Sequence, residues 1–102
     1  MIILTTWPDA ESARAATRKL VEEKLAACGN LVPGIESIYR WQGKIETSSE
    51  VLVIFKTTAA RLAQLEERIR ELHSYEVPEI LAVPVGAGLP AYLRWVEESC
   101  RD

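Results

Sequence analysis

The segment LVPGIESIYRWQGKIETSSEVLVIFKT, residues 31–57, predicts two long antiparallel strands joined by a tight turn. We expect the turn at Trp41-Gln42-Gly43-Lys44, because glycine permits the positive φ that a short hairpin turn needs. Pro33-Gly34 predicts a bulge, since proline donates no hydrogen bond to a neighbouring strand. At ~3.3 Å per residue, a strand of about twelve residues spans about 40 Å, whereas a domain of this length has a radius of gyration of about 13 Å. The hairpin is therefore expected to extend beyond the body of its own domain.

The residues before the hairpin predict a strand followed by a helix. The run Ile2-Ile3-Leu4-Thr5-Thr6 is apolar and rich in β-branched residues, and Trp7-Pro8 ends it because proline disfavours a helical conformation in the residue before it. Asp9 suits the N-cap of the helix that follows. We expect this helix to end at Cys28-Gly29-Asn30, with Gly29 in the left-handed cap position.

The residues after the hairpin predict a helix, a strand and a second, short helix. Leucine and isoleucine recur at helical spacing over residues 62–72, with Thr57 or Thr58 as the N-cap. Residues 79–85 favour a final strand, and Pro90 suits the first turn of a terminal helix. The order βαββαβ predicts an α+β fold of the ferredoxin-like type in a single domain, residues 1–102, with a long hairpin and a C-terminal helix.

Two strands carry apolar residues at consecutive positions, over residues 51–55 and 80–83. Such strands are buried on both faces, although two helices can cover only one face of a sheet. We therefore expect a second copy of the chain to cover the other face. An aspartate at Val53 or Leu81 is expected to break this contact, because an unpaired buried carboxylate is costly.

Composition and charge narrow the classes of partner. The 102 residues carry a formal net charge of −3 without a cluster of Lys or Arg, so nucleic acid is not an expected partner. The apolar N-terminal run is too short for a signal peptide or a membrane span, which predicts a cytoplasmic protein without a membrane partner. The two cysteines have no zinc-binding or thiol-exchange spacing.

Several ordered motifs resemble the CutA family. They are Leu25-Ala26-Ala27-Cys28, Val32-Pro33-Gly34-Ile35, the segment from Ser37 to Ile45, Phe55-Lys56-Thr57, and the segment from Leu72 to Ile80. The resemblance runs from Thr5 to Trp95. It implies a ferredoxin-like subunit in a homotrimer similar to the PII signalling proteins, and a role in tolerance of divalent cations, copper especially. It implies no catalytic activity and no obligatory cofactor. An alternative is a structural or signalling trimer that binds a small anion or an unidentified protein partner in the clefts between its subunits.

His73 is the first candidate metal ligand, because imidazole binds copper and zinc. In some relatives, copper binding is attributed to a cysteine at the end of the first strand and two adjacent histidines at the end of the second helix. This chain has Thr5 and Leu72 at two of those positions, so only His73 matches. The resemblance therefore implies weak binding of copper or another divalent cation.

Cys28 and Glu79 are weaker metal candidates. A free cysteine packs more often than it binds metal, and Cys100, close to the C-terminus, is expected to be exposed. As residues lining an intersubunit cleft we expect Lys56, Tyr75, Glu79 and Trp41. A structural ion pair is the commoner role for such a lysine and carboxylate, and burial in a subunit interface is the preferred explanation of Trp41.

Overall fold

The computed structural model describes residues 1–101 as one four-stranded sheet with helices beside it. The elements in chain order are β1 (Ile2–Trp7), α1 (Ala10–Glu22), β2 (Cys28–Trp41), β3 (Lys44–Lys56), a 3₁₀ turn η1 (Ala59–Arg61), α2 (Leu62–Leu72), β4 (Ile80–Val83) and α3 (Pro90–Ser99). The strand order is β2-β3-β1-β4, and each neighbouring pair is antiparallel. This confirms the predicted ferredoxin-like α+β fold.

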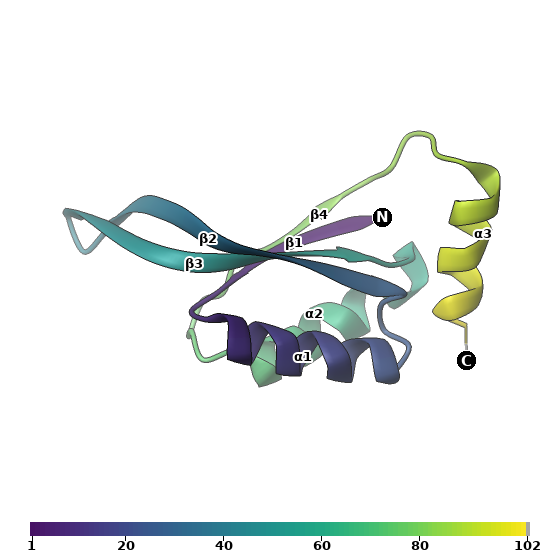
Figure 1. Ribbon diagram of the computed structural model, residues 1–102, viewed down its shortest axis with the longest axis horizontal. Helices are drawn as coiled ribbons and strands as arrows, with labels where there is room; N and C mark the ends of the chain where they lie inside the picture. The colour runs from purple at the N-terminus through teal and green to yellow at the C-terminus, as the bar shows by residue number, and fades with distance from the viewer. Residues whose placement is uncertain (102) are drawn as a thin grey trace.

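The sheet has one covered face and one open face. Figure 1 shows α1 and α2 side by side beneath the sheet, with no helix above it. Alternate residues of β1 follow this division: Ile3, Thr5 and Trp7 are buried toward the helices, and the residues between them are only partly buried. The core lies between sheet and helices, where Phe55 of β3 packs with residues of α1 and α2 such as Leu20 and Ile69.

The open face is apolar but is exposed in the single chain. Leu4 lies opposite both Ile54 and Leu81, so these three side chains share the face away from the helices. Leu81 is 54% exposed, whereas Val53 is fully buried toward the helices. The expectation that Val53 belongs to the open face is therefore wrong. A run of consecutive apolar residues does not reveal which of them faces which side.

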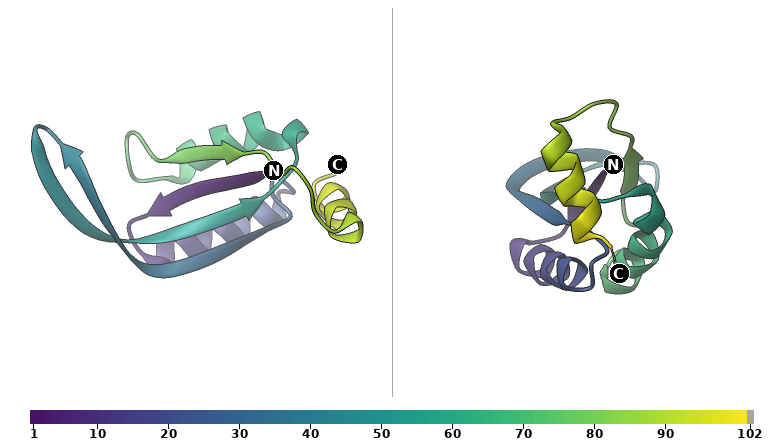
Figure 2. Two further views of the ribbon diagram at one scale, coloured as in Figure 1. Left: turned by 90° about the horizontal axis from the view of Figure 1, so that it is seen from above. Right: turned by 90° about the vertical axis from the view of Figure 1, so that its right-hand side faces the viewer.

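The hairpin of β2 and β3 extends beyond the rest of the molecule, as predicted. Gln42 and Gly43 form its turn with φ of 49° and 76°, which is the positive-φ pair of a two-residue turn. The register shifts between Val32 and Ile35, confirming the bulge at Pro33-Gly34. The molecule measures 45 × 26 × 22 Å, and Figure 2 shows the hairpin at one end and α3 at the other.

The end of α1 differs from the prediction. The helix ends at Glu22, and Lys24 rather than Gly29 takes a positive φ, of 61°. Gly29 lies in β2, where a Cβ would come within 2.6 Å of the Thr17 Cγ2 atom and 3.0 Å of the Phe55 ring. The glycine is needed for close packing of α1 on the strand, not for a helix cap. Asp9 caps α1 as predicted, accepting a hydrogen bond from Ser12 N at 2.7 Å.

The second half of the chain shows three smaller differences. β4 ends at Val83 rather than at residue 85. Thr58 precedes the 3₁₀ turn without making a side-chain cap, and Thr57 is buried and donates its hydroxyl hydrogen bond to Leu25 O at 2.7 Å. Cys100 is only 3% exposed, so the expectation of an exposed thiol is wrong. No helix of residues 1–101 is long and apolar enough to cross a membrane.

Candidate functional site

His73 lies directly after α2 and is held on both sides of its ring. Its Nε2 atom is 2.7 Å from the carbonyl oxygen of Thr6, and its Nδ1 atom accepts a hydrogen bond from Tyr75 N at 3.0 Å. A carbonyl only accepts, so Nε2 carries the proton and the imidazole is neutral in this arrangement. Both nitrogens are therefore used inside the protein. A metal ion at His73 must displace one of these two hydrogen bonds.

Aromatic rings enclose the imidazole. It stacks on Trp7 with ring centroids 4.2 Å apart and lies 4.6 Å from the Tyr75 ring. The Trp7 indole donates to the Thr5 hydroxyl at 2.8 Å, which in turn donates to Val53 O at 3.3 Å. Thr5 is thus a buried hydrogen-bonding residue.

The contact between Tyr75 and Glu50 was missed by sequence reasoning. The Tyr75 hydroxyl donates to Glu50 Oε2 at 2.8 Å, and Glu50 is only 8% exposed at the base of the hairpin. Burial, followed by this hydrogen bond and the charge of Glu50, raises the pKa of Tyr75 to about 12. One signal in the sequence could have predicted a partner for Glu50. This carboxylate directly precedes the strand segment with buried residues that starts at Val51, where an unpaired charge would be costly.

The weaker metal candidates, Cys28 and Glu79, do not form a cluster of ligands with His73 among the described residues. The Cys28 thiol, at the start of β2, is 3.7 Å from the Tyr92 hydroxyl of α3. This contact with the thiol, followed by burial, raises the pKa of Tyr92. Glu79 is exposed just before β4. Within residues 1–101, no three His, Cys, Asp or Glu side chains gather as a metal site.

The four cleft candidates are not brought together within one chain. Lys56 lies opposite Ile2 at the start of β1, where its ammonium group donates to Asn30 Oδ1. Tyr75 reaches the other end of the sheet, where Val51 lies opposite Trp7. Trp41 is 58% exposed at the hairpin tip. A shared cleft would therefore need more than one copy of the chain.

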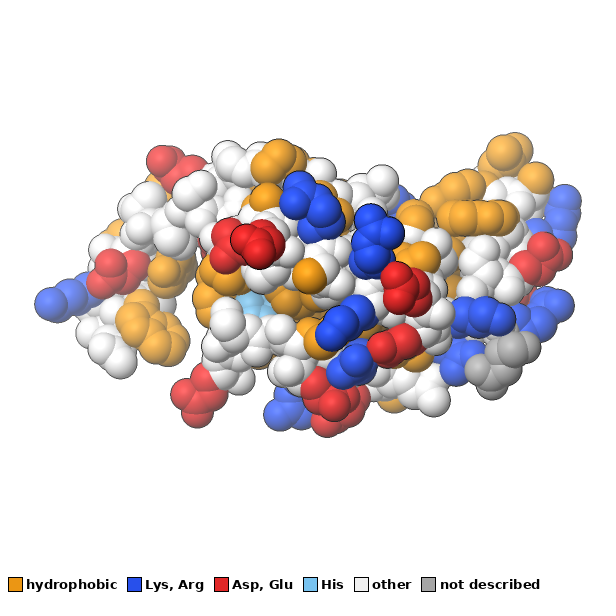
Figure 3. All heavy atoms as spheres, turned by 60° about the horizontal axis from the view of Figure 1, so that its bottom comes forward, with side chains coloured by type: hydrophobic (Ala, Val, Ile, Leu, Met, Phe, Trp, Pro, Cys, Tyr) orange, Lys and Arg blue, Asp and Glu red, His pale blue; other side chains and the backbone are white. Residues whose placement is uncertain are grey.

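The helix-covered side carries mixed charge. Figure 3 shows Lys and Arg interspersed with Asp and Glu over this side. One of the pairs is Arg68 with Glu23, at 2.9 Å, which links α2 to the C-terminal end of α1. The hydrogen bond with Arg68 lowers the pKa of Glu23. This surface is well solvated rather than specialised for a polyanion.

Comparison with known proteins gives one family over nearly the whole chain. Residues 1–99 match the family model described as CutA1 divalent ion tolerance protein. The chain is 48% identical over 98 residues to the divalent-cation tolerance protein CutA of Thermus thermophilus, covering 96% of this chain and 95% of that protein. It is 42% identical over 102 residues to the chloroplastic protein CutA of Arabidopsis thaliana, covering all of this chain but 56% of that longer protein. Among solved structures, the periplasmic divalent cation tolerance protein CutA of Archaeoglobus fulgidus superposes with a TM-score of 0.95 at 38% identity, covering 98% of this chain and 97% of that one.

The prediction of a cytoplasmic location is wrong. Two of these similar proteins are named chloroplastic and periplasmic. Proteins of this fold thus occur in several compartments, so the features that this chain shares with them do not indicate the cytoplasm.

Proposed function

The chain belongs to the CutA1 family of divalent ion tolerance proteins, and on that premise we propose that it acts in tolerance of copper and other divalent cations as a homotrimer that binds these ions weakly. The full-length family match carries this proposal, supported by relatives named for divalent-cation tolerance. We propose a binding role rather than catalysis, with no obligatory cofactor.

His73 is the proposed metal contact, with Cys28 and Glu79 as secondary candidates. The proposal of weak binding is supported by the hydrogen bonds of the imidazole to Thr6 O and Tyr75 N. An ion must replace one of them, and the free energy of that lost bond is subtracted from the affinity. Such an ion would also need ligands beyond this one imidazole, because sites for zinc usually have three or four protein ligands.

The trimer is supported by the open face of the sheet. Leu4, Ile54 and Leu81 form an apolar surface there, and a second copy would remove it from water. The overhanging hairpin, with Ile38, Trp41 and Ile45 about 60% exposed, would reach past its own domain to a neighbour. Assembly would also supply the contacts that a single chain of this length lacks.

The test of metal binding is a titration with Cu(I), Cu(II) and Zn(II) against a competing chelator, with the mass of the assembly followed in parallel. The key variant is His73→Gln, because the glutamine side chain can also both donate and accept a hydrogen bond but has no imidazole. We expect at least a ten-fold loss of affinity for His73→Gln and smaller losses for Cys28→Ser and Glu79→Gln. Unchanged affinity in all three variants would contradict these assignments.

The alternative function, a structural or signalling trimer with ligands in its clefts, is favoured by Lys56. Its ammonium group lies on the open face beside Asn30, where a second copy would cover it. A small anion could then pair with Lys56. Calorimetry with inorganic phosphate and citrate tests this function. The alternative function requires that one of these anions binds, and that Lys56→Gln abolishes the binding while the assembly keeps its mass.

A further inference from the structure

We propose that Lys44, at the tip of the hairpin of one copy, forms an ion pair with the buried carboxylate of Glu50 in the next copy of the chain. The inference rests on the proposed homotrimer and deepens it, because it names a residue that a neighbouring copy contributes beside Tyr75 and His73. Three observations support it: a buried carboxylate that lacks a cation, an exposed cation that lacks a carboxylate, and a strand that keeps the two apart within one chain.

Glu50 has one hydrogen bond and no ion pair within residues 1–101. The residue is 8% exposed, and its Oε2 atom accepts from the Tyr75 hydroxyl at 2.8 Å. Its Oε1 atom has no hydrogen bond but still reaches solvent, because Thr17 Oγ1 is the one sealed side-chain atom without a partner in the described part of the chain. Glu50 therefore offers an oxygen atom to a donor from outside its own chain.

Glu50 lies on the side of the sheet that other copies are proposed to cover. Val51, Val53 and Phe55 are buried in the core with the helices. Side chains alternate along a strand, so Glu50 follows Ile54 to the open face. A copy packed on this face would remove the carboxylate from water. Burial of a carboxylate without a cation is strongly destabilising, so the covering copy must supply one.

Lys44 is the basic residue that the hairpin presents on the same face. It is exposed at the tip, and it forms no ion pair with any other described residue. Lys44 and Glu50 are six positions apart in a stretch of β3 with a continuous register, so both side chains point to one face. Arg40, which lies opposite Ile45, points to the other face of the hairpin.

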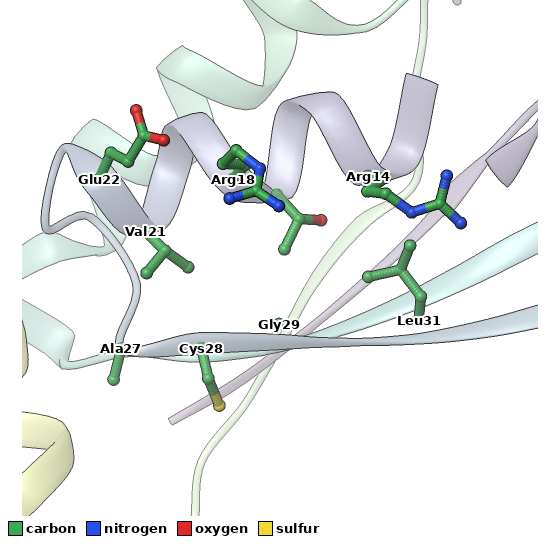
Figure 4. A pocket seen from close by; sticks show the side chains of 9 residues that line it. Arg14, Arg18, Val21, Glu22, Ala27, Cys28, Gly29 and Leu31 are labelled. Carbon is green, nitrogen blue, oxygen red and sulfur yellow. The ribbon is translucent and has the colours of Figure 1, made fainter. Parts of the chain in front are cut away.

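Other basic side chains are held elsewhere. Those of α1 belong to the helix-covered side, as Figure 4 shows for Arg14 and Arg18 above β2. Arg68 forms an ion pair between the two helices, and Lys56 is hydrogen-bonded in its own chain. Arg94 belongs to α3, which lies at the end of the molecule opposite the hairpin (Figure 2). Lys44 is therefore the cation best placed to reach a neighbouring copy.

The pair cannot form within one chain. Six positions along a strand correspond to about 20 Å, whereas an ion pair needs the nitrogen and oxygen within about 4 Å. A contact from the tip of one hairpin to the base of the next joins two different surfaces, and such contacts repeat around a closed ring of copies. Tyr75 contacts both Glu50 and His73, so the lysine of the neighbouring copy would lie beside the proposed metal contact.

The experiment is a double-mutant cycle measured as the rate of subunit exchange. Isotope-labelled and unlabelled assemblies are mixed in enough urea for the unmodified subunits to exchange within hours, and native mass spectrometry follows the mixed masses. Lys44→Gln is expected to speed exchange about five-fold or more in the unmodified protein, but less than about two-fold when Glu50→Gln is also present. The glutamine amide at position 50 still accepts from the Tyr75 hydroxyl and needs no cation.

Arg40→Gln is the matched control, because it removes one positive charge from the same hairpin tip but from the other face. The proposal is overturned if Lys44→Gln has equal effects in the two backgrounds, or if Arg40→Gln shows the same dependence on Glu50. A single-chain mass for the unmodified protein would overturn the homotrimer and this pair together. An intact assembly without coupling would overturn the pair alone.

A charge reversal tests whether the two residues meet across copies. Lys44→Glu places two carboxylates together in its own assembly, but not where the next copy carries Glu50→Gln. When the two variants are mixed, assemblies that contain both chains are expected in about two-fold or greater excess over random association, because like charges disfavour the unmixed Lys44→Glu assembly. A random distribution of masses would mean that the residues do not meet, and the proposal would fail.

Discussion

At the scale of single residues, His73 shows how a candidate ligand can also be a structural residue. The imidazole connects the end of β1 to the chain after α2 through Thr6 O and Tyr75 N, and it is 8% exposed. We predict that His73→Ala lowers the free energy of unfolding by about 2–3 kcal/mol, because two hydrogen bonds and a ring stack are lost. Urea denaturation measures this change.

The control for His73→Ala is Glu66→Ala in α2. Glu66 is exposed, so its removal is expected to change stability by less than about 0.5 kcal/mol. Equal effects of the two substitutions would show that the hydrogen bonds and ring stack of His73 do not contribute to the free energy of unfolding. His73 would then be free to bind a metal ion without cost.

Tyr75 gives the fold a dependence on alkaline pH. Its pKa in the folded protein is about 12, against an ordinary value of 10.0, so folding favours the protonated hydroxyl. This contribution to stability is complete below pH 10 and is lost as pH rises through 12. We predict that the stability difference between the unmodified protein and Tyr75→Phe shrinks over this range, measured by urea denaturation from pH 8 to 12. A constant difference would contradict the role of the hydroxyl.

At the scale of elements, the packing of α1 on β2 depends on Gly29. An alanine there would bring its Cβ within 2.6 Å of Thr17 Cγ2, so we predict that Gly29→Ala costs about 1–3 kcal/mol of stability. Adding Thr17→Ser removes the clashing methyl group and should restore part of the loss. Gly86→Ala is the control, because no atom lies within 4 Å of a Cβ at that position. Thermal unfolding of the four proteins checks the prediction, and a double variant no more stable than Gly29→Ala would refute it.

Local chemistry in the sequence was sufficient for most elements. Pro8, Asp9, Gly43 and Pro90 act through their own backbone or side chain, and each lies where its element begins, ends or turns. The prediction of Gly29 as a helix cap was wrong, because the role of this glycine depends on Thr17, which is distant in the sequence and close in space. The same limit explains the site: His73 was visible as a residue type, but its partners Thr6 and Tyr75 are fixed by tertiary packing.

At the scale of the whole molecule, the open face is the feature that a single chain leaves unexplained. Ile54 and Leu81 flank Leu4 across three strands, and Leu81 is 54% exposed. We predict that Leu81→Asp dissociates the assembly yet leaves a folded subunit, because the carboxylate is hydrated in the free chain and would be buried only in the assembly. Val53→Asp should instead unfold the protein, since Val53 is fully buried within one chain. Sedimentation equilibrium with circular dichroism separates the two outcomes. If Leu81→Asp keeps the mass of the unmodified assembly, another surface must hold the subunits together.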